Sequence, residues 1–229
     1  MKAVVFDMDD TLLNWRQAEQ AAILELATLH FAAHGIAADR VREVYNGVMA
    51  ENFAAWKAKR EWMYIDVRLR ILSERLQTHD RLKVEDLVAT FSREATAKLA
   101  FLEGAEDAMR AARSAGRKTA ILTNGRSEVQ RPKVFAFGLH TAVDFVGITG
   151  ELGAWKPDPM AFRLVLDSLG VQPVHALMVG DNEDFDITPA KALGMQTCWV
   201  DPEGRSHADA DLVVKTPAAL ARLFQPKAA

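Results

Sequence analysis

The sequence has little cysteine, no long apolar run and little net charge, and each of these absences argues against a class of protein. Its 229 residues include one cysteine, Cys198, so no internal disulfide can form, which fits a reducing cytoplasm. No uncharged apolar run approaches the ~20 residues of a membrane-spanning helix, and a charged motif within the first ten residues argues against a signal peptide. The formal net charge of −3 disfavours nucleic acid and membranes as partners. We therefore expect a cytoplasmic protein.

Proline and strand patterns are both missing from residues 14–99. Apolar residues recur in this segment at i, i+3, i+4 and i+7, which is the spacing of one helix face. In one of the expected helices these positions are Val41, Val44, Tyr45 and Val48. The pattern predicts a bundle of about four helices, and we assign it to an all-helical domain over residues 14–101.

Outside that segment, short apolar runs alternate with helical patterns. The expected strands are residues 4–6, 119–122, 145–148, 176–179, 197–200 and 212–214. Strands that alternate with helices form parallel sheets with right-handed crossovers. We therefore expect an α/β fold, a Rossmann-like parallel sheet with helices on both faces, built from residues 1–13 and 102–229. The helical domain is inserted after the first strand, and we expect it to lie over the carboxyl end of the sheet.

Polar residues suited to a cation and a phosphate follow the central strands. They are Asp7 and Asp9 after the first strand, Thr123 and Asn124 after the second, Lys156 after the third, and Asp181 and Asp186 after the fourth. Open α/β sheets bind ligands beyond the carboxyl ends of their strands, so we expect these side chains to converge. Carboxylate oxygens suit a hard cation such as Mg²⁺. The set predicts a site that binds a divalent cation and a phosphoryl group together.

The first of these pairs has two interpretations. Asp7 and Asp9 lie two residues apart, so on a continuing extended chain both side chains would point the same way. One carboxylate could then attack a substrate while the other transfers a proton. Alternatively, the stretch is an ordinary strand end in which Asp10 and Thr11 serve as turn and cap residues. The polar residues after the other strands favour the first interpretation.

Four motifs, in this order and spacing, resemble the haloacid dehalogenase (HAD)-like hydrolase superfamily. The matching segments are Asp7-Met8-Asp9-Asp10-Thr11, Ile121-Leu122-Thr123-Asn124, Lys156-Pro157-Asp158-Pro159, and Gly180-Asp181 through Asp186. The resemblance extends from residue 4 to about residue 200. It implies the phosphatase branch of the family, in which a helical cap domain is inserted after the first motif.

The resemblance also implies a role for each polar residue. Asp7 would be the nucleophile that takes the phosphoryl group as an aspartyl-phosphate, and Asp9 would be the general acid and base. The Asp7 side chain, the Asp9 backbone carbonyl and Asp181 would hold Mg²⁺. Phosphate oxygens would be bound by Thr123 and Lys156, with the amide at Asn124 assisting.

Four more residues complete the predicted site. Asp186 would support it as a direct or indirect metal ligand, or by holding Lys156. Asn14 and Trp15 follow the first motif at once, and Arg126 follows the second. These three residues are therefore candidates for contact with the substrate.

The expected function is Mg²⁺-dependent hydrolysis of a small phosphorylated metabolite, a phosphate monoester such as a sugar phosphate or nucleotide. A phosphomutase or another phosphoryl transferase would carry the same residues, and this alternative stays open. A dehalogenase is disfavoured because that branch lacks a proton-shuttling acid two residues after its nucleophile, where this chain has Asp9. A catalytically idle binding protein is disfavoured because the nucleophile, the acid and the lysine are all present. The small-molecule substrate is the main partner expected, for a monomer or a homodimer.

Overall fold

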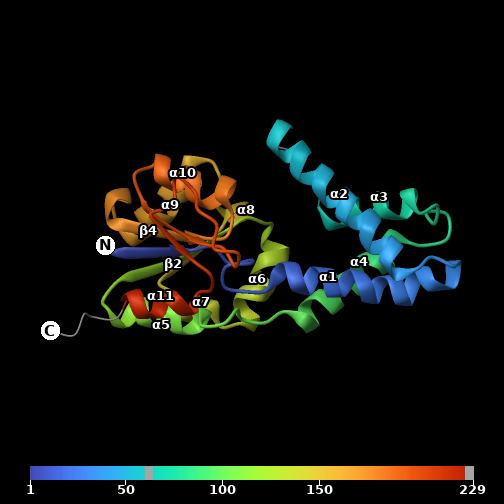
Figure 1. Ribbon diagram of the computed structural model, residues 1–229, viewed down its shortest axis with the longest axis horizontal. Helices are drawn as coiled ribbons and strands as arrows, with labels where there is room; N and C mark the ends of the chain where they lie inside the picture. The colour runs from blue at the N-terminus through green and yellow to red at the C-terminus, as the bar shows by residue number, and fades with distance from the viewer. Residues whose placement is uncertain (60–63, 225–229) are drawn as a thin grey trace. The chain divides into compact units, whose positions relative to one another are not determined.

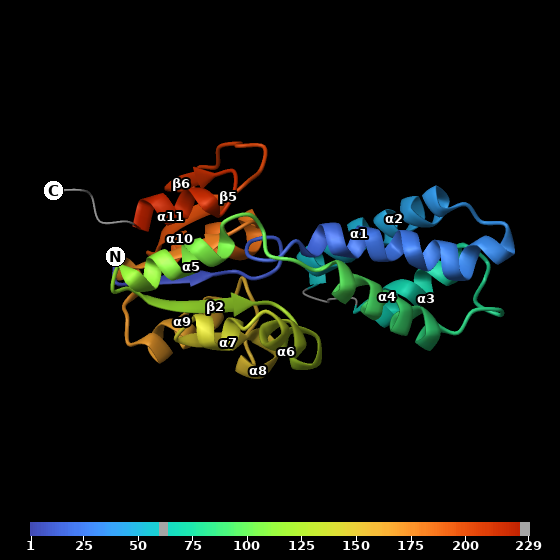
Figure 2. The ribbon, with the colours of Figure 1, turned by 90° about the horizontal axis from the view of Figure 1, so that it is seen from below.

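The chain forms two compact units (Figures 1 and 2). The computed structural model describes residues 1–59 and 64–224. One unit comprises Met1–Asn14 and Ala100–Ala229, and the other comprises Trp15–Leu99. The Asn14 backbone N–H donates to the Ala100 carbonyl at 3.0 Å, and the Ala100 N–H donates to Asn14 Oδ1 at 2.7 Å. The two connections to the inserted unit therefore leave the first unit side by side.

The first unit is built on a six-stranded parallel sheet with the order β3-β2-β1-β4-β5-β6. The strands are β1 (Ala3–Phe6), β2 (Lys118–Thr123), β3 (Phe145–Ile148), β4 (Ala176–Gly180), β5 (Gln196–Val200) and β6 (Leu212–Val214). Phe6 of β1 pairs in register with Ile121 of β2 and Val179 of β4. The chain therefore leaves these three neighbouring strands at the same edge of the sheet. The predicted parallel sheet is confirmed.

Helices cover both faces of this sheet. Figure 1 shows α9 (Pro159–Leu169) and α10 (Thr188–Ala192) on one side, with α5 (Ala105–Ser114) and α11 (Ala218–Phe224) on the other. Further helices of the unit are α6 (Ser127–Ala136), α7 (Leu139–Ala142), α8 (Thr149–Leu152) and η3 (Pro173–His175). The predicted fold class, with helices on both faces of the sheet, is confirmed.

The limits of α9 follow from its sequence. Asp158 accepts a hydrogen bond from the Met160 N–H at 2.9 Å, which satisfies a donor at the helix start. Pro159 occupies the first helical position, where a missing N–H costs nothing. Gly170 ends the helix in the left-handed conformation with φ 64°. The apolar face of α9 packs on the sheet, so the helix holds the segment before it, which carries Lys156, against the carboxyl end of the strands.

The described residues of the second unit form helices and no strand, as predicted. Its helices are α1 (Trp15–Leu26), α2 (Ala38–Lys59), α3 (Ile65–Arg75) and α4 (Val84–Lys98), and α1 continues through the shorter turns η1 (Ala27–Phe31) and η2 (Ala32–His34). Among the described residues, no single helix is long and apolar enough to cross a membrane. One pair, Trp15–His34 with Ala38–Trp56, reaches that length and composition only as a combination bent by 119°.

A buried polar group joins three helices of the second unit. Arg68 Nη1 of α3 donates to Glu19 Oε1 of α1 at 3.1 Å, and the Tyr45 hydroxyl of α2 donates to the same oxygen at 3.0 Å. All three side chains are nearly inaccessible to solvent. Burial raises the pKa of Tyr45 well above its ordinary value, and the nearby Glu19 carboxylate acts in the same direction. The helical unit therefore has a core of its own, with a polar centre.

The helical segment between β4 and β5 is not one regular helix. It begins as a π-helical turn, η4 (Glu183–Ile187), and only then becomes α10. Asn182 Oδ1 accepts hydrogen bonds from the N–H groups of Asp184 and Phe185. Pro189 in the following turn has no N–H to donate back into η4. The wider turn places Asp186 toward the sheet, where it is fully buried.

Candidate active site

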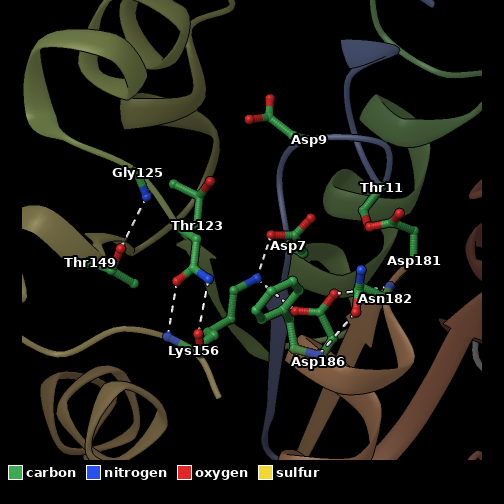
Figure 3. A network of polar contacts seen from close by, with 12 residues as sticks. Asp7, Asp9, Thr11, Thr123, Gly125, Thr149, Lys156, Asp181, Asn182 and Asp186 are labelled. Atoms are coloured by element: carbon green, nitrogen blue, oxygen red, sulfur yellow. Dashed lines mark hydrogen bonds and ion pairs between the residues drawn. The ribbon is translucent and has the colours of Figure 1, made fainter. Parts of the chain in front are cut away.

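Asp7 is the first residue after the buried strand β1. Its N–H continues the strand pairing by donating to the Val179 carbonyl at 2.8 Å, so its position is fixed by the middle of the sheet. The carboxylate is only 5% exposed, and its Oδ1 accepts a hydrogen bond from Lys156 Nζ at 2.6 Å. Figure 3 shows this pair at the centre of the site. Asp7 and Lys156 are thus brought together as predicted, although they are 149 residues apart in the chain.

Lys156 is held by its main chain as well as by its ammonium group. The Asn124 side chain donates from Nδ2 to the Lys156 carbonyl at 3.0 Å and accepts from the Lys156 N–H at 2.9 Å. This paired contact links the end of β2 to the segment before α9. The Asn124 side chain therefore positions Lys156 in this structure, and its predicted assistance in binding phosphate stays a prediction.

Three carboxylates gather beside the Lys156 ammonium. Oxygen atoms of Asp7, Asp181 and Asp186 lie within 4.8 Å of one another. Asp186 Oδ1 accepts from Lys156 Nζ at 2.6 Å, and its Oδ2 accepts from the Asn182 N–H at 3.2 Å. Of the supporting roles predicted for Asp186, holding Lys156 is observed directly.

Three neighbours explain how these acidic residues reach the site. A Cβ atom at Gly180 would lie 2.4 Å from Cγ of Asp186, so only glycine at this position allows the carboxylate to approach. The Trp199 indole N–H donates to the Asp181 carbonyl at 2.8 Å. The Thr11 hydroxyl lies 3.4 Å from Asp181 Oδ1, a long hydrogen bond. Asp181 is therefore oriented from β5 and from the loop after β1.

The electrostatics of this group favour a bound cation. Burial raises the pKa of Asp7 to about 7, an effect that Asp186 reinforces and the Lys156 ammonium opposes. Burial acts to lower the pKa of Lys156, but Asp186 and Asp7 outweigh it and the pKa lies above its ordinary value. Three carboxylates around one ammonium leave an excess of two negative charges when all are ionised. Hard oxygen donors with this excess fit a divalent cation such as Mg²⁺.

Asp9 is placed differently from the expectation for an extended chain. The strand ends at Phe6, so Asp7 and Asp9 do not lie on a continuing extended chain and the rule for alternating side chains does not apply to them. Figure 3 shows Asp9 directed away from Asp7. The Asp9 side chain lies outside the cluster of three carboxylates. The prediction that Asp9 offers a metal its backbone carbonyl is unaffected, because it does not involve the side chain.

Two residues of α6 that the motifs did not indicate contact Asp9. Lys133 Nζ lies 2.9 Å from Asp9 Oδ1 and 2.8 Å from Oδ2. Gln130 Nε2 donates to Asp9 Oδ2 at 2.9 Å and to the hydroxyl of Thr123 at 2.8 Å. Their spacing of three residues places both side chains on one face of α6, but nothing in the sequence indicates that this face meets Asp9. Thr123 itself is buried at the end of β2, as expected of a residue facing the site.

The three candidate substrate contacts lie in other settings. Asn14 pairs with Ala100 across the two connections, and Trp15 packs edge to face on Phe91 of α4, with ring centroids 6.3 Å apart. Arg126 precedes α6, about half exposed, and its guanidinium is 3.9 Å from the Glu128 carboxylate. Contact between these residues and a substrate stays a prediction.

Comparison with known proteins points to one family. The family model of the haloacid dehalogenase-like hydrolases matches residues 1–194. Phosphoserine phosphatase from Thermus thermophilus is 30% identical over 229 residues, which cover 88% of this chain and 89% of that protein.

Solved structures share the fold over the full length of the chain. The HAD-hydrolase YfnB from Bacillus subtilis, whose structure was solved bound to magnesium, superimposes with a TM-score of 0.80 at 20% identity, covering 98% of this chain and 99% of the other. L-2-haloacid dehalogenase from Xanthobacter autotrophicus gives a TM-score of 0.71 at 22% identity, with both chains covered completely. Because the fold is common to enzymes with different reactions, the chemistry has to be argued from the residues of the site.

Proposed function

Because this chain belongs to the haloacid dehalogenase-like hydrolase family, we propose that it is a Mg²⁺-dependent phosphatase of small phosphate monoesters. The observation that carries the proposal is the contact of Asp7 with Lys156 within a cluster of buried carboxylates. A carboxylate and a phosphate repel each other, so a carboxylate nucleophile needs positive charge beside it. The named activity of the Thermus thermophilus relative supports the same reaction class.

The proposed metal site consists of the Asp7 and Asp181 carboxylates with the Asp9 backbone carbonyl. Asp186 supports it by holding Lys156, and its buried carboxylate adds to the negative charge. When bound there, Mg²⁺ would offset the charge of the carboxylates and of the phosphate oxygens. Magnesium in the structure of the Bacillus subtilis neighbour is consistent with this choice of ion.

In the proposed first step, an Asp7 carboxylate oxygen forms a bond to phosphorus while the bond to the ester oxygen breaks. Asp9 gives its proton to the departing oxygen, so the product leaves as a neutral alcohol. Lys156 and Thr123 hold the remaining phosphate oxygens. In the second step Asp9 takes a proton from water, whose oxygen attacks the aspartyl-phosphate and releases inorganic phosphate and Asp7.

Two alternatives use the same fold. A phosphomutase would return the phosphoryl group from Asp7 to a sugar hydroxyl instead of to water. A dehalogenase would attack carbon and would have no use for a proton donor at position 9. Here an acid is present at that position, Asp9, which favours phosphoryl transfer over attack at carbon.

A substrate screen tests the proposal. The purified chain is incubated with sugar phosphates, nucleotides and phosphoserine, in Mg²⁺ or in EDTA, and both free phosphate and remaining ester are measured. We expect free phosphate to match the loss of ester, only in the presence of Mg²⁺. The activity should disappear in Asp7→Asn and persist in Asp107→Asn, a matched change at an exposed carboxylate on α5. Isomerised ester without free phosphate would indicate a mutase, and full activity in EDTA would rule out the metal role.

A further inference from the structure

Helix α6 directs two buried polar side chains toward Asp9. Gln130 is 2% exposed and Lys133 is 8% exposed, although a glutamine and a lysine on a ten-residue helix are usually solvated. They lie three positions apart and therefore on one face of the helix. Burying a lysine is costly unless its ammonium is paired, and this ammonium is paired with both oxygens of Asp9.

Gln130 joins the two parts of the proposed site. Its Nε2 donates to Asp9 Oδ2, to the Thr123 hydroxyl and to the Asn124 carbonyl, at distances from 2.8 to 2.9 Å. One amide group thus spans the proposed acid and base and the end of β2, where the phosphate would bind. Gly125 permits this arrangement, because a Cβ atom there would lie 2.6 Å from Cγ of Gln130.

The orientation of the Gln130 amide is set by the same contacts. Nε2 faces a carboxylate and a carbonyl, which only accept hydrogen bonds, so the reversed amide would place oxygen against oxygen. Oε1 is buried, and among the described residues it has no hydrogen-bond partner. A buried amide oxygen without a partner is costly, so the contacts of Nε2 outweigh this cost and determine how the Gln130 side chain is oriented.

The contacts also distinguish the two oxygens of Asp9. Among the residues that the structure describes, Oδ2 accepts from both Lys133 and Gln130, whereas Oδ1 accepts from Lys133 alone. A carboxylate offers roughly two acceptor positions on each oxygen. Oδ1 therefore keeps capacity for one more partner, and the Asp9 side chain is 22% exposed, which leaves it open to one.

We propose that Gln130 and Lys133 are positioning residues for the proton-transfer step. Together they fix the Asp9 carboxylate relative to Thr123 and present Oδ1 to the leaving oxygen of the substrate. The inference rests on the proposed function, because it assumes that Asp9 acts as acid and base. Asp7 has a separate cation in Lys156, so loss of Lys133 should weaken proton transfer and leave nucleophilic attack intact.

The first test compares leaving groups in Lys133→Met. Release of p-nitrophenol from p-nitrophenyl phosphate needs no proton donor, whereas release of an alcohol from an alkyl phosphate does. In single turnovers with Mg²⁺ we expect alcohol release to slow by about a hundredfold and p-nitrophenol release by less than about threefold, because general acid catalysis contributes factors of this size. Gln130→Met should show the same preference more weakly. Lys133→Arg should restore much of the alcohol release.

A matched control and a double variant separate positioning from other roles. Arg131→Met removes a neighbouring cation of α6 that pairs with Glu151 outside the site, and it should leave both rates unchanged. In an Asp9→Asn background, Lys133→Met should add less than about a threefold further loss, because residues that act through one another are not additive. If Lys133→Met slowed alcohol release as much in the Asp9→Asn background as in the wild type, Lys133 would act on the substrate independently of Asp9, and the inference would be overturned.

Further outcomes distinguish this inference from the proposed function. If Asp9→Asn slows alcohol release but Lys133→Met and Gln130→Met do not, the positioning role is wrong and the proposed function stands. If Asp9→Asn slows release from neither ester, the role of Asp9 as acid and base is wrong, and the inference fails with it.

Thermal unfolding of each variant is recorded. Should Lys133→Met not fold, the leaving-group comparison in Gln130→Met decides, and equal losses on both esters there would overturn the inference.

Discussion

Asp7 and Asp9 contact two different lysines. Asp7 contacts Lys156 at 2.6 Å, and Asp9 contacts Lys133 at 2.8 Å at the nearer oxygen. The two ammonium groups come from different parts of the chain, the segment before α9 and the helix α6. A substitution at one lysine therefore leaves the other pair in place. This separation is the physical basis for giving the two aspartates different roles.

The acidic cluster makes a prediction about Asp181. In Asp181→Ala one of three carboxylates near the proposed cation is lost, and hard-cation affinity depends on the number and charge of oxygen ligands. We expect the Mg²⁺ concentration for half-maximal activity to rise by about tenfold or more, the size of change seen when metal sites lose supporting groups. Asp167→Ala, at an exposed carboxylate of α9, is the control. An unchanged Mg²⁺ requirement in Asp181→Ala would exclude this residue as a ligand.

At the scale of elements, the helical unit depends on its polar centre as well as on apolar packing. Glu19, Tyr45 and Arg68 each come from a different helix, and their contacts fix how α1, α2 and α3 meet. Removing one member of such a group leaves a buried charge or polar atom unpaired. The titration of Tyr45 provides a way to observe this group in solution.

The pKa of Tyr45 predicts a pH dependence of stability. Burial raises this pKa above 10.0, so above that pH the hydroxyl ionises in the unfolded chain while it remains neutral in the folded one. Tyr45 therefore makes its full contribution to the free energy of unfolding below pH 10. Above pH 10 this contribution falls by about 1.4 kcal/mol per pH unit. Tyr45→Phe cannot ionise, so its unfolding free energy should fall less steeply above pH 10. Urea unfolding of both proteins at several pH values measures the slopes, and equal slopes would contradict the account.

Elements were predictable from the sequence to different degrees. The strands were recognisable because they are short apolar runs that end in polar residues, and Asp7 and Lys156 were found from those ends. The direction of the Asp9 side chain was not predictable, because it depends on where β1 stops and on the irregular backbone that follows. Gln130 and Lys133 were missed because their partner Asp9 lies 121 and 124 residues away, a separation across which periodicity carries no information.

At the scale of the molecule, the inserted unit is attached through two adjacent connections. Asn14 and Ala100 are hydrogen-bonded to each other, so the ends of the insert are already in contact. The proposed catalytic, phosphate-binding and metal-binding residues all belong to the first unit, and that unit has its own apolar core. The unit should therefore be able to fold without the insert.

Deletion of the helical unit tests this organisation. We expect a chain in which a short Gly-Ser turn replaces residues 15–99 to unfold cooperatively and to retain Mg²⁺-dependent hydrolysis of acetyl phosphate, a very small substrate. Discrimination among larger esters should be reduced, because the sequence predicts that the inserted helical domain is a cap that carries the substrate specificity. The measurements are thermal unfolding and kcat/KM over a panel of esters. An unchanged order of preference would place specificity in the first unit alone.

The central claim is that Asp7 carries the phosphoryl group during turnover. In Asp9→Asn, water is no longer activated, so the aspartyl-phosphate should accumulate when the substrate is p-nitrophenyl phosphate. Acid quenching, borohydride reduction and peptide mass spectrometry then locate the modified residue. The account predicts that reduction converts Asp7 to homoserine in the quenched enzyme and not in enzyme without substrate. An unmodified Asp7 in an enzyme that has released p-nitrophenol, or modification at another carboxylate, would contradict it.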